Sequence, residues 1–252
     1  MKAAEVLAAL GLPAVARVER RVPKTMLHEH GAPTAADKRR ISDGIEQLVW
    51  VAALKPTTIG VAEYRDDVRD YLEIAVLHLT MRSAAKVGRL VELVHRAVPY
   101  PVLLVAEQAE RVHLSVAHKR WSQGEAGRTV LDGEVVGVEW DGAGDDPHRA
   151  AFDEALALGR QPRGTLFALY QGWIDTLLAL QAARRMGVFA KLGSADRAAQ
   201  RREALLECER LEAEIARLRA AAAREKQMPR QVELNLELKR VEASRTAALA
   251  RL

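Results

Sequence analysis

The hydrophobic and polar positions between residues 71 and 119 follow the pattern of one β-α-β-β unit. Residues 71–79 are mostly apolar on both faces of an extended chain, as expected for an interior strand covered on both sides. Residues 84–98 place apolar side chains at spacings of three and four, which predicts a helix with one buried side. Residues 102–105 and 111–119 then return as strands, and the second alternates as a strand with one wet face does.

The connections within this unit set the direction of its strands. A strand-helix-strand crossover in one sheet is right-handed, so the strands at 71–79 and 102–105 should be parallel. The link from 102–105 to 111–119 is short, so these two strands should pair as an antiparallel hairpin. The unit is therefore expected at the centre of a mixed sheet.

Further elements are expected on both sides of this unit. Residues 17–33 read as an irregular arm, residues 34–44 as a helix and residues 45–54 as a strand. Residues 134–140 alternate valine with glycine and acids, which suits an edge strand that must not recruit another chain. We therefore predict an α+β domain over residues 1–160, with a mixed sheet of four to five strands and flanking helices.

Residues 161–252 are expected to form a helical region that ends in a hairpin. From about residue 196 the apolar positions step by three and four, the spacing of a heptad seam. With a break at residues 227–229, the seam comprises Cys208, Leu211, Ile215, Leu218 and Ala222, then Leu234, Leu238, Val241, Arg245, Ala248 and Leu252. Two such helices joined by a short turn favour an antiparallel coiled-coil hairpin over about 196–252. A seam of this kind can also join two copies of the chain into a homo-oligomer.

Composition narrows the class of protein. No apolar run approaches the roughly 20 residues that span a bilayer. Glu5 places an acid where a secretory signal would be apolar, so we expect a cytoplasmic protein. The single Cys208 excludes an internal disulfide and a thiolate-rich zinc site. We expect neither a cofactor nor a bound metal.

Positive charge is concentrated near the C-terminus. Residues 184–252 hold 16 Lys and Arg against 10 Asp and Glu, whereas the preceding residues hold 22 against 24. At and beyond the expected hairpin turn lie the basic residues Arg224, Lys226, Arg230, Lys239 and Arg240. Such a tip can contact the phosphate backbone of DNA and release counterions. The alternative is the solvated surface of a coiled coil that packs on its own domain or on a partner.

Several short blocks of the sequence resemble a known family. They are Pro23-Lys24, residues 50–56, Leu72-Glu73-Ile74, residues 98–103, residues 115–119, Tyr170-Gln171-Gly172-Trp173 and residues 225–239. Together they resemble the bacterial domain-of-unknown-function family 4391. The resemblance implies an unassigned activity and genes that often lie beside DNA methyltransferases and helicases in restriction-like or phage-defence-like clusters. Relatives carry a polar residue two places after the acid of the central strand, whereas this chain has Ala75.

The most specific catalytic alternative is a metal-dependent nuclease of the restriction-endonuclease kind. Such a site has one acid near the end of a strand. The next strand carries a second acid, followed by any one residue and then a lysine. The carboxylates bind Mg²⁺ and the lysine helps to orient or activate water. Asp66, Asp67 or Asp70 can supply the first acid. Glu73 can supply the second, but Ala75 stands where the lysine belongs.

The missing lysine favours a protein without catalysis. Together with what the resemblance implies, this leads us to expect an accessory or scaffold protein of a bacterial restriction-like or anti-phage defence system. Its partner would be a DNA methyltransferase or a helicase, with DNA as a further ligand of the hairpin. Mg²⁺ would be needed only by the nuclease alternative.

Overall fold

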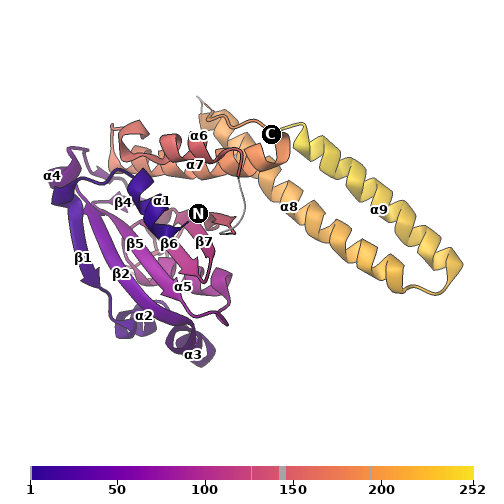
Figure 1. Cartoon of the computed structure of the whole chain (residues 1–252), viewed down its shortest axis with the longest axis horizontal. Coiled ribbons are helices and arrows are strands. Elements are labelled where there is room, and N and C mark those ends of the chain that lie inside the picture. The colour runs from indigo at the N-terminus through magenta and orange to yellow at the C-terminus, as the bar shows by residue number, and fades with distance from the viewer. Residues whose placement is uncertain (1, 126, 142–145, 193–194) are drawn as a thin grey trace. The chain divides into compact units, whose positions relative to one another are not determined.

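Six strands form one mixed sheet, in the spatial order β1-β2-β5-β6-β7-β10. The computed structural model describes residues 2–125, 127–141, 146–192 and 195–252 (Figure 1). The strands of the sheet are β1 (Arg17–Arg21), β2 (Ile45–Leu54), β5 (Ile74–Met81), β6 (Val102–Gln108), β7 (Arg111–Ala117) and β10 (Val136–Trp140). Two small ladders accompany it, β3 (Tyr64–Arg65) with β4 (Asp70–Tyr71) and β8 (Lys119–Trp121) with β9 (Thr129–Leu131).

The chain divides into two compact units, Met1–Leu177 and Leu178–Leu252. The first unit holds the sheet and the helices α1 (Ala3–Ala9), α2 (Lys24–His30), α3 (Ala35–Gly44), α4 (Pro56–Ile59), α5 (Val87–Ala97) and α6 (Arg149–Leu156). The boundary between the units falls within α7 (Leu166–Met186). The second unit holds α8 (Ala195–Arg224) and α9 (Met228–Leu249).

The central strands have the directions that the sequence predicts. β5 and β6 are parallel, with Ala75 opposite Val102, and the helix α5 forms the crossover between them. β6 and β7 are antiparallel, with Val102 opposite Ala117. β10 pairs with β7 and forms one edge of the sheet, as predicted. The α+β class and the mixed sheet are therefore confirmed.

The sheet has more strands than the four to five predicted, because the arm at 17–33 is not irregular. Its first part is β1, which pairs antiparallel with β2 at the other edge of the sheet, and a later part is α2. β1 has the sequence RVERR, and four of its five side chains are exposed. A strand with so few apolar side chains gives no alternating signal, so only its pairing with β2 identifies it.

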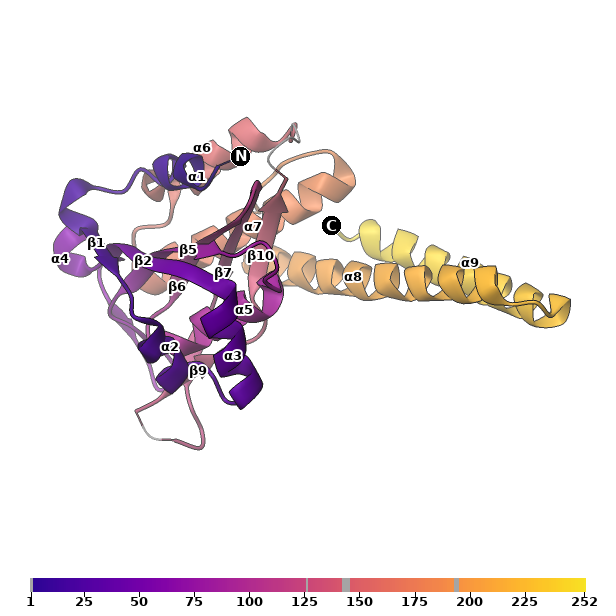
Figure 2. The ribbon, with the colours of Figure 1, turned by 60° about the horizontal axis from the view of Figure 1, so that its bottom comes forward.

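Helices cover both faces of the sheet (Figures 1 and 2). α2, α3 and α5 lie on one face, where Leu77 and Leu79 of β5 share a buried cluster with Leu90 and Val94 of α5. α1 and α6 lie on the opposite face. The central strands are thus buried on both sides, which explains their continuous apolar sequence.

The second unit is an antiparallel helical hairpin. Arg219 of α8 pairs with Glu242 of α9 at 2.7 Å, and Glu212 of α8 pairs with Arg245 of α9 at 3.4 Å, so residue numbers fall on one helix as they rise on the other. The predicted seam positions of α8 are all buried: Cys208, Leu211, Ile215, Leu218 and Ala222. A coiled-coil geometry for this hairpin stays a prediction. Within the part of the chain that is described, every helix is too short or too polar to cross a membrane.

Candidate functional site

The carboxylates of the predicted nuclease site are engaged in separate local contacts. Asp66 accepts hydrogen bonds from the Tyr64 hydroxyl at 2.7 Å and from the backbone N–H groups of Val68 and Arg69. The Tyr64 hydroxyl and the backbone donors hold the pKa of Asp66 below its ordinary value. Asp70 pairs with Arg65 across the β3–β4 ladder at 3.1 Å. Both aspartates therefore stabilise this short ladder.

Glu73 is paired with a lysine that the sequence pattern does not indicate. Its carboxylate is buried and lies 2.8 Å from Nζ of Lys55, directly after β2. The hydrogen bond to Glu73 raises the pKa of Lys55. Lys55 is 18 positions before Glu73 and approaches it because β2 and β5 are paired, with Leu54 opposite Ile74. Ala75, where a nuclease lysine was sought, belongs to the buried cluster beneath α5.

The structure does not bring Asp66, Asp70 and Glu73 into one metal-binding group. Among the described residues, no three side chains of the types His, Cys, Asp and Glu are grouped so that they could hold a metal ion. Each of the three carboxylates instead has a cation or hydrogen-bond donors from the protein. The positions of these three carboxylates therefore do not support the nuclease hypothesis.

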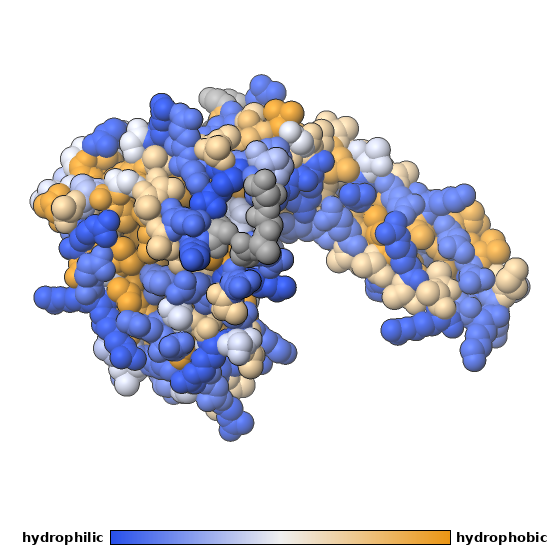
Figure 3. Space-filling model, viewed as in Figure 1, coloured by the Kyte–Doolittle hydropathy of each residue, from blue (hydrophilic) through white to orange (hydrophobic). Residues whose placement is uncertain are grey.

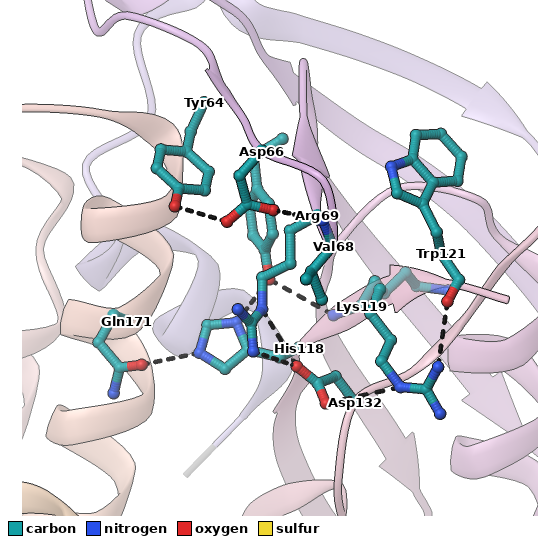
Figure 4. A network of polar contacts seen from close by, with 11 residues as sticks. Tyr64, Asp66, Val68, Arg69, His118, Lys119, Trp121, Asp132 and Gln171 are labelled. Carbon is teal, nitrogen blue, oxygen red and sulfur yellow. Dashed lines mark hydrogen bonds and ion pairs between the residues drawn. The ribbon is translucent and has the colours of Figure 1, made fainter. Parts of the chain in front are cut away.

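A chain of polar contacts runs through the end of β7 (Figure 4). The backbone N–H of Lys119 donates to the Tyr71 hydroxyl, which lies 2.5 Å from Nδ1 of His118. Nε2 of His118 lies 2.7 Å from Oε1 of Gln171 on α7, and Nε2 of Gln171 donates to Asp175 at 2.8 Å. This order of donors fits a neutral imidazole that carries its proton on Nε2. Burial raises the pKa of Tyr71, which keeps its hydroxyl protonated and able to donate.

An ion-paired group lies beside this chain (Figure 4). Arg69 donates from Nε and Nη2 to the same oxygen of Asp132, at 3.1 and 2.5 Å. The guanidinium of Arg69 also lies over the ring of Phe167, 5.6 Å from its centre. Arg120 approaches the other oxygen of Asp132 at 3.8 Å. These contacts attach the chain around Asp132, after β9, to the β3–β4 ladder and to α7.

Two buried basic residues lie where β7 and β8 meet the end of α5. Lys119 is 1% exposed, and its ammonium donates to the carbonyl oxygens of His95 and Val98. Burial lowers the pKa of Lys119 to about 7. Burial, with a smaller effect of the nearby Lys119 charge, lowers the pKa of His95 to about 3, and its Nε2 lies 3.0 Å from the Ser115 hydroxyl. Lys119 thus satisfies carbonyl groups at the C-terminal end of a helix.

Tyr170 of α7 connects this helix to the ends of β6 and β7. Its hydroxyl donates to the Val102 carbonyl at 2.6 Å and accepts from the backbone N–H of Ala117 at 2.8 Å. Val102 and Ala117 are partners in the β6–β7 ladder, so one side chain joins both strands at the same position. Three of the blocks that carry the family resemblance, at 98–103, 115–119 and 170–173, therefore meet here.

The arrangement positions strands and helices, and it offers no open acid-base group. Both ring nitrogens of His118 face protein partners, and Lys119, His95 and Tyr170 are buried. Sequence reasoning missed Lys119 and His95 as a pair. The available signal was a lysine that directly follows an apolar strand, but its partners lie more than 20 residues away in α5 and its C-terminal extension.

A hollow of about 420 Å³ with a partly polar wall opens on the face of the sheet opposite α2, α3 and α5. Glu107 accepts from the Thr80 hydroxyl at 3.2 Å and lies 3.1 Å from Nε2 of His78. These residues link the ends of β5 and β6, and Gln47 of β2 lines the same hollow. His78, Thr80 and Glu107 thus contact one another across the ends of β5 and β6.

The predicted nucleic-acid residues of the hairpin are all at the surface. Arg224, Lys226, Arg230, Lys239 and Arg240 are exposed. Arg224, Lys226 and Arg230 surround the turn between α8 and α9, and Arg230 lies 3.9 Å from Glu225. Their contact with DNA stays a prediction.

The fold and its network define an α+β protein whose strand ends are tied to helices by buried polar side chains. The chain belongs to the family of the domain of unknown function DUF4391, whose family model matches residues 10–244. This match confirms the resemblance seen in the sequence blocks. No curated protein and no solved structure matches the chain.

Proposed function

We propose that this chain is a cytoplasmic, non-catalytic accessory protein of a bacterial restriction-like or anti-phage defence system. In this proposal the α8–α9 hairpin binds a DNA methyltransferase or a helicase. The family resemblance supports the setting, because relatives are often encoded beside such enzymes. The observation that carries the proposal is a line of exposed apolar side chains on α9, the α9 stripe, formed by Met228, Val232 and Leu236.

The α9 stripe lies on the side of α9 that the hairpin does not use for its own packing. Met228, Val232 and Leu236 are 70%, 53% and 54% exposed. Successive residues of a helix turn by about 100°, so the stripe lies roughly opposite the seam that contains Leu238 and Ala248. Figure 3 shows hydrophobic side chains between hydrophilic ones on the hairpin. Regularly spaced apolar side chains on an exposed helix face suit a groove or helix of another protein.

The charges around the α9 stripe add to this argument. Lys239 follows Leu236 on nearly the same side of the helix, and Arg240 lies beside it. The exposed Glu233 lies three residues before Leu236, so the rim of the stripe carries both signs of charge. An apolar centre with a charged rim is typical of a protein interface. The proposal also agrees with the engagement of Asp66, Asp70 and Glu73 in contacts within the protein.

Substitution of the stripe should abolish partner binding while leaving the fold intact. We expect the tagged wild-type chain to recover a methyltransferase or helicase from the native host, identified by mass spectrometry. The combined variant Met228→Ser, Val232→Ser and Leu236→Ser should recover at least about tenfold less, because buried apolar anchors dominate interface energies. The variant Val15→Ser, Val188→Ser is the matched control, since these side chains are also exposed, at 68% and 71%.

Four results would contradict the proposal. The first is a stripe variant that recovers the partner at the control level, and the second is a wild-type chain that recovers neither class of enzyme. If light scattering instead shows a dimer that only the stripe variant loses, the stripe binds a second copy of this chain. Cleavage of plasmid DNA by the purified protein with Mg²⁺ or Mn²⁺, abolished by Glu73→Ala, would replace the accessory role with the nuclease.

A further inference from the structure

Cationic side chains from separate segments gather at the C-terminal end of α3. Nζ of Lys24 donates to the carbonyl oxygens of Ser42 and Ile45, at 3.1 and 2.5 Å. Nη1 of Arg82, from the end of β5, donates to the carbonyl oxygens of Asp43 and Ser42, at 2.9 and 3.3 Å. Carbonyl groups at the end of a helix carry partial negative charge, so they hold these two cations in place.

More cations surround this pair. Arg21 ends β1 and Lys24 begins α2 three residues later. Burial, followed by the nearby charges of Arg82 and Arg21, lowers the pKa of Lys24. A hollow of about 370 Å³ on the same helix end is lined by Arg39, Arg40 and Lys86. We call the six residues the α3 cationic surface: Arg21, Lys24, Arg39, Arg40, Arg82 and Lys86.

The α3 cationic surface has few acids to neutralise it. Asp43 is the acid that lines the hollow, and Arg40 pairs with Asp37, a buried carboxylate that Arg89 also binds. Of the acids that the structure describes, none forms an ion pair with Arg21, Arg39 or Lys86, whose side chains are exposed. Three exposed cations that lack a carboxylate partner, within a larger cationic cluster, indicate a polyanionic ligand.

The chemistry of the surrounding helices narrows the ligand to a duplex. Insertion into a membrane, or into an apolar protein interface, needs exposed large apolar side chains. α2, α3 and α5 are described in full, and none of their large apolar side chains is exposed. These helices also contain no Phe, Tyr or Trp on which unpaired bases could stack. Arginine and lysine alone suit the phosphates of a double helix, whose bases remain paired.

We propose that the α3 cationic surface binds the phosphate backbone of double-stranded DNA without reading its sequence. This places the DNA contact on the first unit, whereas the charge distribution along the sequence pointed to the hairpin. Figures 1 and 2 show α2 and α3 together at one end of the sheet. The inference does not depend on the partner proposed for the α9 stripe, because none of its residues belongs to the hairpin.

The test compares two charge-matched triple variants of the full chain. Arg21→Gln, Arg39→Gln, Lys86→Gln removes three exposed cations of the α3 cationic surface, and Arg224→Gln, Arg230→Gln, Lys239→Gln removes three from the hairpin. Binding to a fluorescent duplex of about 20 base pairs is measured by anisotropy over a range of salt concentrations. Each lost phosphate contact lowers the slope of log affinity against log salt by about 0.9.

We expect wild type and the hairpin variant to bind with the same steep salt dependence. The surface variant should lose roughly 100-fold in affinity at about 0.1 M salt, with a slope lower by about 2.7. Unchanged thermal unfolding of both variants would show that the loss is not a folding defect. The proposal fails if the wild type does not bind duplex DNA, if only the hairpin variant loses affinity, or if polyglutamate competes as well as unlabelled DNA, which would indicate an acidic protein ligand.

Discussion

The free energy of unfolding should rise between pH 7 and pH 10, and the Lys119→Met variant should lose most of this rise. In the folded protein burial lowers the pKa of Lys119 to about 7, against 10.5 in an unfolded chain. Between these two values the unfolded chain binds the proton and the folded chain does not, so raising the pH favours folding. The shift corresponds to roughly 4–5 kcal/mol across the window.

Urea denaturation at intervals from pH 7 to pH 10 measures this effect. Lys119→Met should be less stable than wild type at pH 9, because it leaves the His95 and Val98 carbonyls without their donor, but its profile should be nearly flat. Lys38→Met, at an exposed position of α3, is the control and should keep the wild-type slope. An equal slope in Lys119→Met and wild type would show that the Lys119 amino group is not buried as described.

Tyr170→Phe should lower the free energy of unfolding by about 2–4 kcal/mol, because a buried donor and a buried acceptor each lose their partner. The Tyr170 hydroxyl serves the Val102 carbonyl and the Ala117 N–H. The substitution keeps the ring, so packing with Trp173 and His118 is retained. The loss therefore isolates the hydroxyl that joins β6, β7 and α7.

Chemical denaturation at pH 7 checks this prediction, with Tyr100→Phe as the matched control at a half-buried site. Tyr100→Phe should change the free energy of unfolding by less than about 0.5 kcal/mol. If Tyr170→Phe behaves like this control, the strand ends at Val102 and Ala117 must find other partners, and the network does not hold β6 and β7 to α7.

The two surfaces proposed for binding have different physical characters. The α9 stripe is apolar with a charged rim, so it suits a protein. The α3 cationic surface is polar and rich in arginine, so it suits phosphates. A protein that holds a DNA-modifying partner with one surface and DNA with the other would bring both together. The separate triple variants test the two surfaces independently.

The sequence by itself determined the elements whose signal is local. The apolar run of β5, the three-and-four spacing of α5 and the alternation in β7 each lie within one segment, and burial of a repeated side fixes their type. The same applies to the seam of α8, whose predicted positions are all buried. The direction of β5 and β6 also followed, because a helix between two neighbouring strands returns the chain to the end of the sheet where the first strand began.

The tertiary structure alone decided the contacts between residues that are distant in the chain. Polar β1 became a strand only by pairing with β2, and Lys55 reached Glu73 only because β2 and β5 are neighbours. Similarly, Lys24 and Arg82 meet at the end of α3, although the sequence places them far apart. The periodicity of a segment records which of its sides is buried, but it carries no record of which other segment covers that side. Sites built from several segments therefore emerge only when the chain is packed.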